Sequence, residues 1–244
     1  NQTADIGRDG DEALAGNIFK YVSRDALGYM LSYFDGDYKP IQPGSPLAFN
    51  ETVPSSAGTG LDLFNGNIRA THTQIGQLGT PKTYSYRYDQ LNRLLRMRKH
   101  ETTYQPIVGS NPPALNIAAE TAEYQEDVSY DANGNILSYA RNGNNGQLNM
   151  DALTYQYERN GSGQMISNKL RYVHDRVPDA NYTEDIDNQT SLTYTQVLAD
   201  NNSSQSGDNY AYDRIGNLIK DTKEKIANIE WTVYGKIRKI TKND

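Results

Sequence analysis

The side chains best suited to proton transfer or metal binding in this chain are its three histidines, His72, His100 and His174. No two of them stand at the short spacing typical of a zinc-binding motif. Asp175 follows His174 and could complete half of a nucleophilic triad, but no Gly-x-Ser-x-Gly elbow occurs in the sequence. We therefore expect each histidine to be solvated or hydrogen-bonded, and we predict no enzymatic activity.

Nearby carboxylates form a second set of candidates, since pairs of them carry out glycoside hydrolysis in many enzymes. The two groups are Asp35/Asp37 and Glu184/Asp185/Asp187. Both lie among polar, Gly- or Asn-rich residues, with no apolar wall that would raise the pKa of one partner. Solvated loops are the favoured interpretation, and no catalytic residue is predicted.

The rest of the sequence contains no motif that predicts a metal or cofactor site. Residues 131–135 resemble the start of a calcium loop, but the glycine is misplaced and no bidentate glutamate follows. The chain has no cysteine, which excludes thiolate sites. Its net charge of −6 argues against general nucleic-acid binding. No run of about twenty apolar residues occurs, so no membrane span is expected.

The most informative pattern is a recurring phrase: an aromatic residue, Asp, two variable residues, Gly or Asn, a polar residue and an aliphatic one. Fixed phrases with variable filler indicate a repeat architecture. The clear copies are Tyr88–Leu94, Tyr130–Ile136 and Tyr212–Leu218, and looser copies are Arg24–Met30 and Trp231–Ile237.

Each copy has the chemistry of a hairpin corner. A type I turn favours Asp at its first position, where the side chain caps backbone N–H groups, and Gly at its fourth. A left-handed fourth residue then leads into an antiparallel partner strand. Residues 158–161 match this pattern only poorly, because Glu is seldom a turn cap. The predicted repeat and turn residues are Tyr88, Asp89, Asn92, Tyr130, Asp131, Gly134, Asn135, Tyr212, Asp213, Gly216, Asn217, Asp25, Gly28, Trp231, Thr232 and Gly235.

The flanks of the corners and the composition predict an all-β chain. Tyr84, Tyr86 and Tyr88 alternate with polar residues, as in a strand with one packed face. Fewer than one residue in five is Leu, Ile, Val or Phe, and 19 tyrosines supply the missing apolar area. This composition suits a thin, wide sheet.

We expect one continuous array over residues 1–244, with loop insertions at 103–120 and 176–208. Short helical turns are expected around residues 113–121 and 196–200.

The Tyr-Asp-x-x-Gly-Asn-Ile/Leu phrase resembles the YD repeat of RHS-repeat proteins, a group that includes bacterial Rhs toxins and wall-associated proteins, with teneurins as distant relatives. The similarity covers about residues 18–240, and segments 28–41 and 229–240 look most like Bacteroidetes members. The resemblance implies an antiparallel hairpin array that curves or spirals into a hollow shell around a C-terminal toxin. Its partners would be the rest of that shell, the cargo and the secretion machinery.

Some family properties are not carried over. RHS arrays end in an Asp-Pro-x-Gly-Leu motif where self-cleavage can occur, and this chain has no such motif. We expect the effector itself to lie outside these 244 residues. The resemblance implies a secreted or cell-surface bacterial protein without a cofactor. An extracellular carbohydrate-binding or adhesion surface is the alternative, because Tyr and Asn ladders suit contacts with glycans.

Overall fold

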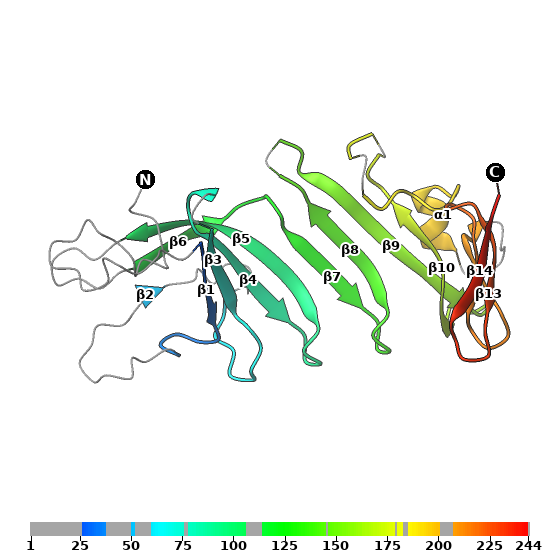
Figure 1. Ribbon diagram of the computed structural model, residues 1–244, viewed down its shortest axis with the longest axis horizontal. Helices are drawn as coiled ribbons and strands as arrows, with labels where there is room; N and C mark the ends of the chain where they lie inside the picture. Colours follow the sequence, from blue (N-terminus) through cyan, green and yellow to red (C-terminus); the bar gives the residue numbers. More distant parts are fainter. Residues whose placement is uncertain are drawn as a thin grey trace. The chain divides into compact units, whose positions relative to one another are not determined.

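The computed structural model describes residues 26–37, 50–51, 60–75, 78–105, 114–144, 146–178, 180–182, 185–200 and 207–243. Most of the regular structure in these ranges is antiparallel β-strand, with one short helix, α1 (Tyr194–Ala199) (Figure 1). The prediction of an all-β chain with little helix is confirmed. Within these ranges, no helix has the length and the apolar composition needed to cross a membrane.

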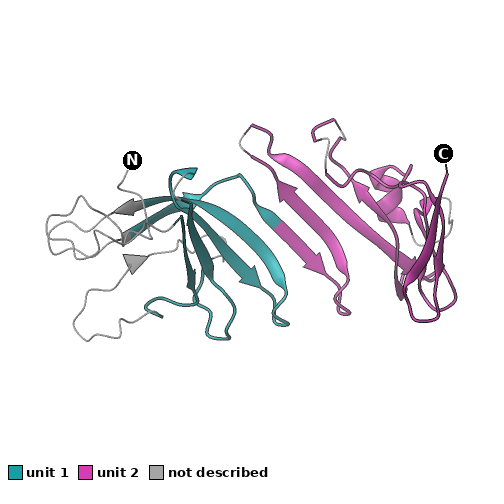
Figure 2. Ribbon diagram, viewed as in Figure 1, with its two compact units in different colours: residues 1–126 teal, residues 127–244 magenta. Residues whose placement is uncertain are grey.

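The chain divides into two compact units, residues 1–126 and 127–244, which are coloured separately in Figure 2. In the first unit the strands follow the order β1-β3-β4-β5-β6, and each neighbouring pair is antiparallel. The short β2 pairs with β6 in parallel. The bounds are β1 (Leu27–Ser32), β2 (Asn50–Glu51), β3 (Ala70–Ile75), β4 (Lys82–Tyr88), β5 (Leu94–Gln105) and β6 (Ala114–Glu120).

The second unit holds two sets of antiparallel strands. The first runs in the order β7-β8-β9-β10, and the second is a four-stranded sheet in the order β11-β12-β13-β14. The bounds are β7 (Glu126–Tyr130), whose first residue belongs to the first unit, β8 (Ile136–Asn142), β9 (Asn149–Arg159), β10 (Met165–Asp175), β11 (Tyr210–Tyr212), β12 (Leu218–Asp221), β13 (Ile226–Trp231) and β14 (Ile237–Lys242).

Both units bury polar side chains, but the second unit buries more apolar ones among the described residues. In the first unit the buried residues of neighbouring strands are largely polar, and they include Ser32, His72, Thr83 and Ser85. In the second unit, strands of both sheets and α1 each contribute buried apolar residues. These residues are Leu153, Tyr157, Tyr172, Val173, Val197 and Ile229.

Two expectations about the loops differ from the structure. Within the interval 103–120, β5 continues to Gln105 and β6 begins at Ala114, so the interval contains hairpin strands. The helical turn expected around 113–121 is wrong, because pairing with β5 overrides the helix propensity of the alanines in β6. The turn expected around 196–200 is present as α1, which starts at a capping box of Thr193 and Gln196.

The loosest copy of the phrase is not a corner. Gly28 lies inside β1, where it pairs with Gln74 of β3, and it has no positive φ. Its role as a turn residue is therefore corrected: pairing along the whole of β1 keeps the backbone extended at that point. Asp25 lies outside the described residues.

Candidate functional site

The corner after β7 shows how one carboxylate organises a turn. The N–H of Gly134 donates to the carbonyl of Asp131 (3.2 Å), and the N–H of Asp131 donates to the carbonyl of Asn135 (3.0 Å). Oδ1 of Asp131 accepts the backbone N–H of Asn135 (2.8 Å), and Oδ2 accepts its side-chain amide (2.8 Å). Gly134 has a φ of 94°, a conformation that glycine adopts without steric cost.

The corner after β11 repeats this arrangement almost atom for atom. Asp213 Oδ1 accepts the backbone N–H of Asn217 (2.8 Å) and of Ile215 (3.0 Å), and Oδ2 accepts the Asn217 amide (2.9 Å). Gly216 has a φ of 96°. The polar residue that follows the left-handed glycine in the phrase is therefore part of the corner, since it binds both carboxylate oxygens through its backbone and its side chain.

Two further corners use other residues for the same bonds. In the corner after β4, Asn92 has the positive φ (61°), and Arg93 donates to Asp89 through its backbone N–H (3.0 Å) and its Nε (2.6 Å). In the corner after β13, Gly235 has a φ of 71°, and Thr232 Oγ1 accepts the N–H of Lys236 at 3.2 Å.

The corner between β9 and β10 lies two residues later than the poor match at 158–161. Its first residue is Asn160, whose Oδ1 accepts the N–H groups of Ser162 (3.0 Å) and Gln164 (2.9 Å). Its fourth residue is Gly163, with a φ of 76°. The corner therefore begins at Asn160, and Glu158 is not its first residue. The sequence feature that could have located this corner is the Asn three residues before a Gly.

Aromatic rings near three of the corners tie their hairpins to the preceding one. Tyr157 donates its hydroxyl to the carbonyl of Ile136 (2.9 Å). Tyr212 donates to the carbonyl of Leu170 (2.9 Å), and the Trp231 indole N–H donates to the carbonyl of Leu218 (2.7 Å). Burial raises the pKa of Tyr157 to about 12, so its hydroxyl stays protonated as a donor.

The other two rings of the phrase, Tyr88 and Tyr130, are half-buried at the ends of β4 and β7. Burial is the main cause that raises the pKa of Tyr88.

The corner carboxylates are held in their ionised form. For Asp131 and Asp213, desolvation opposes ionisation. The hydrogen bonds from Asn135 and Asn217, together with those from other backbone N–H groups of each turn, outweigh it and lower each pKa. For Asp89, the backbone hydrogen bond from Arg93 is the largest cause of a lowered pKa. The corners therefore use charge-assisted hydrogen bonds, which are stronger than neutral ones.

Replacing Asp131 by Ala should destabilise the second unit by about 1 kcal/mol, because the bonds from the Asn135 backbone N–H and side-chain amide are lost. Asp131→Asn keeps an oxygen acceptor for the Asn135 N–H and should lose less. Urea unfolding followed by the fluorescence of Trp231, the single tryptophan, measures both. Equal losses in the two variants would contradict the capping role.

Acid should weaken the corners in a defined direction. A carboxyl pKa lowered by folding contributes stability that is complete above the ordinary value of about 3.9 and is lost as the pH falls through the folded-state value. The combined variant with Asn at 89, 131 and 213 should therefore lose less stability than the unmodified chain between about pH 5 and pH 2. Parallel curves of urea midpoint against pH for the two proteins would refute this.

All three histidines are buried. His72 contacts the hydroxyls of Ser32 (3.2 Å) and Thr83 (2.9 Å), and His100 contacts that of Ser85 (2.7 Å). Ser85 and His100 are 0% and 1% exposed. His174 is buried as well, and desolvation lowers its pKa.

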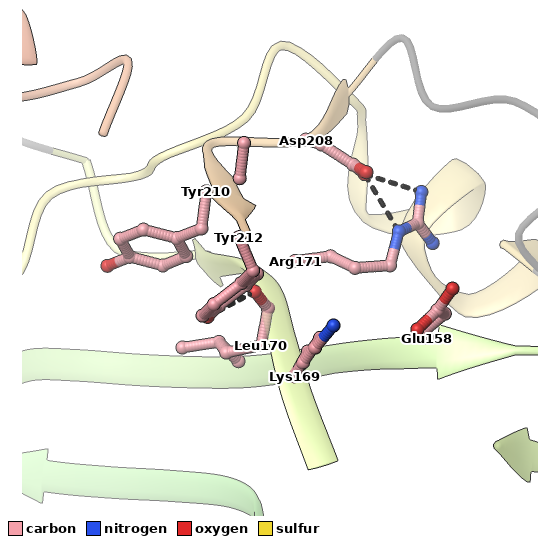
Figure 3. A pocket seen from close by; sticks show the side chains of 8 residues that line it. Glu158, Lys169, Leu170, Arg171, Asp208, Tyr210 and Tyr212 are labelled. Carbon is pink, nitrogen blue, oxygen red and sulfur yellow. Dashed lines mark hydrogen bonds and ion pairs between the residues drawn. The ribbon is translucent and has the colours of Figure 1, made fainter. Parts of the chain in front are cut away.

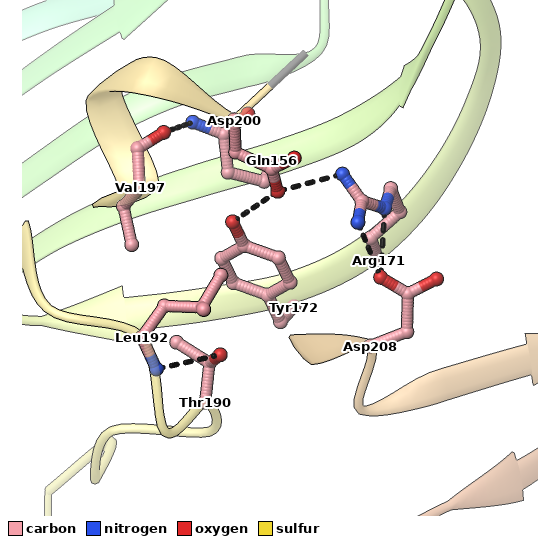
Figure 4. A network of polar contacts seen from close by, with 8 residues as sticks. All are labelled: Gln156, Arg171, Tyr172, Thr190, Leu192, Val197, Asp200 and Asp208. Atoms are coloured by element: carbon pink, nitrogen blue, oxygen red, sulfur yellow. Dashed lines mark hydrogen bonds and ion pairs between the residues drawn. The ribbon is translucent and has the colours of Figure 1, made fainter. Parts of the chain in front are cut away.

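A buried ionic network joins β10 to the residues on either side of the segment 201–206 (Figure 4). Arg171, 4% exposed, contacts Oδ2 of Asp200 (2.8 Å) and Oδ1 of Asp208 (2.7 Å). The hydroxyl of Tyr172 also donates to Oδ2 of Asp200, at 2.6 Å. These bonds anchor the end of α1 and the start of β11, and the sequence phrase did not indicate them.

A small pocket opens beside this network (Figure 3). Its volume is about 260 Å³, and its lining includes Glu158, Lys169, Arg171, Asp208, Tyr210 and Tyr212. The Lys169 ammonium lies 5.8 Å from the centroid of the Tyr212 ring. An aromatic wall with charged groups of both signs can hold a small polar molecule.

Asp35 and Asp187 are exposed in loops, as the sequence suggested, whereas Asp185 differs from that expectation. Asp37 Oδ2 accepts the N–H of Tyr33 (2.6 Å) and so closes a turn. Asp185 Oδ1 is buried, and it lies in a cluster with Asp151 and Asp175. Desolvation is the main cause that raises the pKa of both Asp175 and Asp185. Glu184 lies outside the described residues.

Comparison with known proteins adds no relative: no family model matches the chain, and a search of curated proteins found no match.

Proposed function

We propose that the chain is a structural segment of a secreted or cell-surface RHS/YD-repeat shell, whose hairpin array encloses or presents a C-terminal toxin domain. The observation that carries the proposal is the repeated corner, in which an Asp, Asn or Thr side chain and a left-handed Gly or Asn recur at the ends of five hairpins in the described residues. Repetition of one structural device over the chain suits a wall better than a single active site.

Several properties support this role. Tyrosine and tryptophan donors link successive hairpins, so each hairpin stabilises the next in the manner of a repeat array. The histidines and the Ser85–His100 pair are buried. The partners of such a segment are the remaining repeats, the toxin cargo and a secretion machinery of bacterial origin.

The test uses the full-length protein encoded around this segment. Limited proteolysis should leave the domain downstream of residue 244 intact, whereas the same domain expressed alone should be cleaved quickly. A reading frame with no downstream domain would contradict the proposal. Equal cleavage rates in the two settings would contradict it as well.

A second candidate function, carbohydrate binding, is favoured by the pocket of Figure 3. Tyr212 and Tyr210 supply rings that can stack on a sugar face, and Glu158 and Lys169 supply hydrogen-bonding groups. A glycan array should then show binding that Glu158→Gln weakens. Glu224→Gln, which changes an exposed acid of the same unit, is the matched control. Silence of the unmodified protein across the array would rule out this candidate.

A further inference from the structure

Three carboxylates from separate segments of the second unit converge in a place to which the hairpin array assigns no role. Asp151 lies near the start of β9, Asp175 ends β10, and Asp185 lies in the segment that follows. One carboxylate oxygen from each lies within 4.8 Å of those of the other two. Asp151 and Asp175 are only 3% and 6% exposed, so solvent does little to screen their mutual repulsion.

Two backbone hydrogen bonds to Asp175 end on the same oxygen of its carboxylate. The N–H groups of Ala152 (2.9 Å) and Val177 (3.0 Å) both donate to Oδ1. Neither bond reaches Oδ2. Asp175 is 6% exposed, and its Oδ2 lies outside the bonds from Ala152 and Val177.

The other two acids show the same imbalance. Asp151 forms an ion pair through Oδ2 with Arg141, and its Oδ1 has only a long contact, 3.4 Å, with the N–H of Ile186. Oδ1 of Asp185 is buried and has no hydrogen-bond partner within the described part of the chain. A buried ionised oxygen without a partner raises the free energy of the folded state, and a bound ligand at this atom would remove that cost.

The charges and distances identify the ligand class. Three ionised carboxylates and one guanidinium carry a net charge of −2, which one divalent cation neutralises. Carboxylate oxygens are the ligands that calcium prefers, at about 2.3–2.6 Å, so two oxygens on opposite sides of the ion lie about 4.8 Å apart. The geometry points to a calcium site formed by Asp151, Asp175 and Asp185, with water completing the coordination shell. The ion would fasten the segment around Asp185 to the ends of β9 and β10.

The test is thermal unfolding of the 244-residue protein after treatment with EDTA, followed by Trp231 fluorescence. Addition of about 1 mM CaCl₂ at constant ionic strength should raise Tm by several degrees and in a saturable manner. MgCl₂ should have a smaller effect, because Mg²⁺ requires shorter bonds and gives up its water reluctantly.

A matched pair of variants distinguishes the cluster from acidity in general. Asp185→Asn should weaken calcium binding by about tenfold or more, since it removes a charged ligand. Asp187→Asn removes the same charge two residues away, from a side chain that is 40% exposed and paired with Lys223, and should keep the calcium response. Retention of the full response by Asp185→Asn would overturn the proposal.

Two further results would also overturn it: no rise in Tm with calcium, or an equal rise with MgCl₂ or with NaCl of matched ionic strength. Should Asp185→Asn fail to fold, calorimetric titration of the unmodified protein with calcium decides the matter. About one ion per chain is expected, and no measurable heat would refute the site.

Discussion

Arg171→Met is expected to destabilise the second unit by about 3–5 kcal/mol, a larger loss than any single substitution in a hairpin corner should cause. The change removes the guanidinium that pairs with Asp200 and Asp208 and leaves the buried Asp200 carboxylate without its cation. Breaking a buried pair by removing one partner costs this much because the remaining charge stays desolvated. Urea unfolding at about pH 7, followed by Trp231 fluorescence, gives the free energy of unfolding.

Lys223→Met is the control for this measurement. Lys223 pairs with Asp187 at 3.3 Å, but the two side chains are 36% and 40% exposed. Exposed pairs contribute about 0–1 kcal/mol, so this variant should unfold close to the unmodified protein. If Arg171→Met lost no more stability than Lys223→Met, the network would not be the anchor of the segment between α1 and β11.

Gly163→Val is expected to cost about 2 kcal/mol through backbone strain alone. Gly163 has a φ of +76°, and a β-branched residue resists that conformation. A Cβ at this position would meet no atom within 4 Å, so steric overlap with neighbouring side chains is excluded as a cause. The same urea experiment measures the loss.

The control glycine lies two residues away in the same corner. A Cβ on Gly161 would also meet open space, but the φ of Gly161 is not in the left-handed region. Gly161→Val should therefore change the free energy of unfolding by only about 0.5 kcal/mol or less. Equal costs for the two valines would show that the corner does not depend on the left-handed residue at its fourth position.

Features that depend on interactions between residues close together in the sequence could be predicted from the sequence alone. The fold class follows from alternating tyrosines and turn residues, and it is confirmed. At residues 131–135 and 213–217 every bond of the corner lies within five residues, so the positive φ of Gly134 and Gly216 could be expected from the phrase alone.

Longer-range features could not be obtained in this way. Arg171 meets Asp200 and Asp208 across 29 and 37 residues, and no periodicity marks such a pairing. Asp185 lies among polar neighbours in the sequence, but its Oδ1 is buried and its carboxylate lies close to those of Asp151 and Asp175. The corner at Asn160 was missed for a different reason. The turn pattern was placed on residues 158–161, where Glu158 stands three residues before a glycine, and so it began two residues too early.

The middle positions of the corners carry almost none of the bonding described above. The Ile215, Val233 and Tyr234 side chains are 85%, 94% and 87% exposed. Substitution there should be nearly neutral for folding, while the capping residue and the left-handed residue are constrained. Hairpin tips built in this way can diversify freely over evolutionary time, and a lineage can change what these tips display without redesigning the scaffold beneath them.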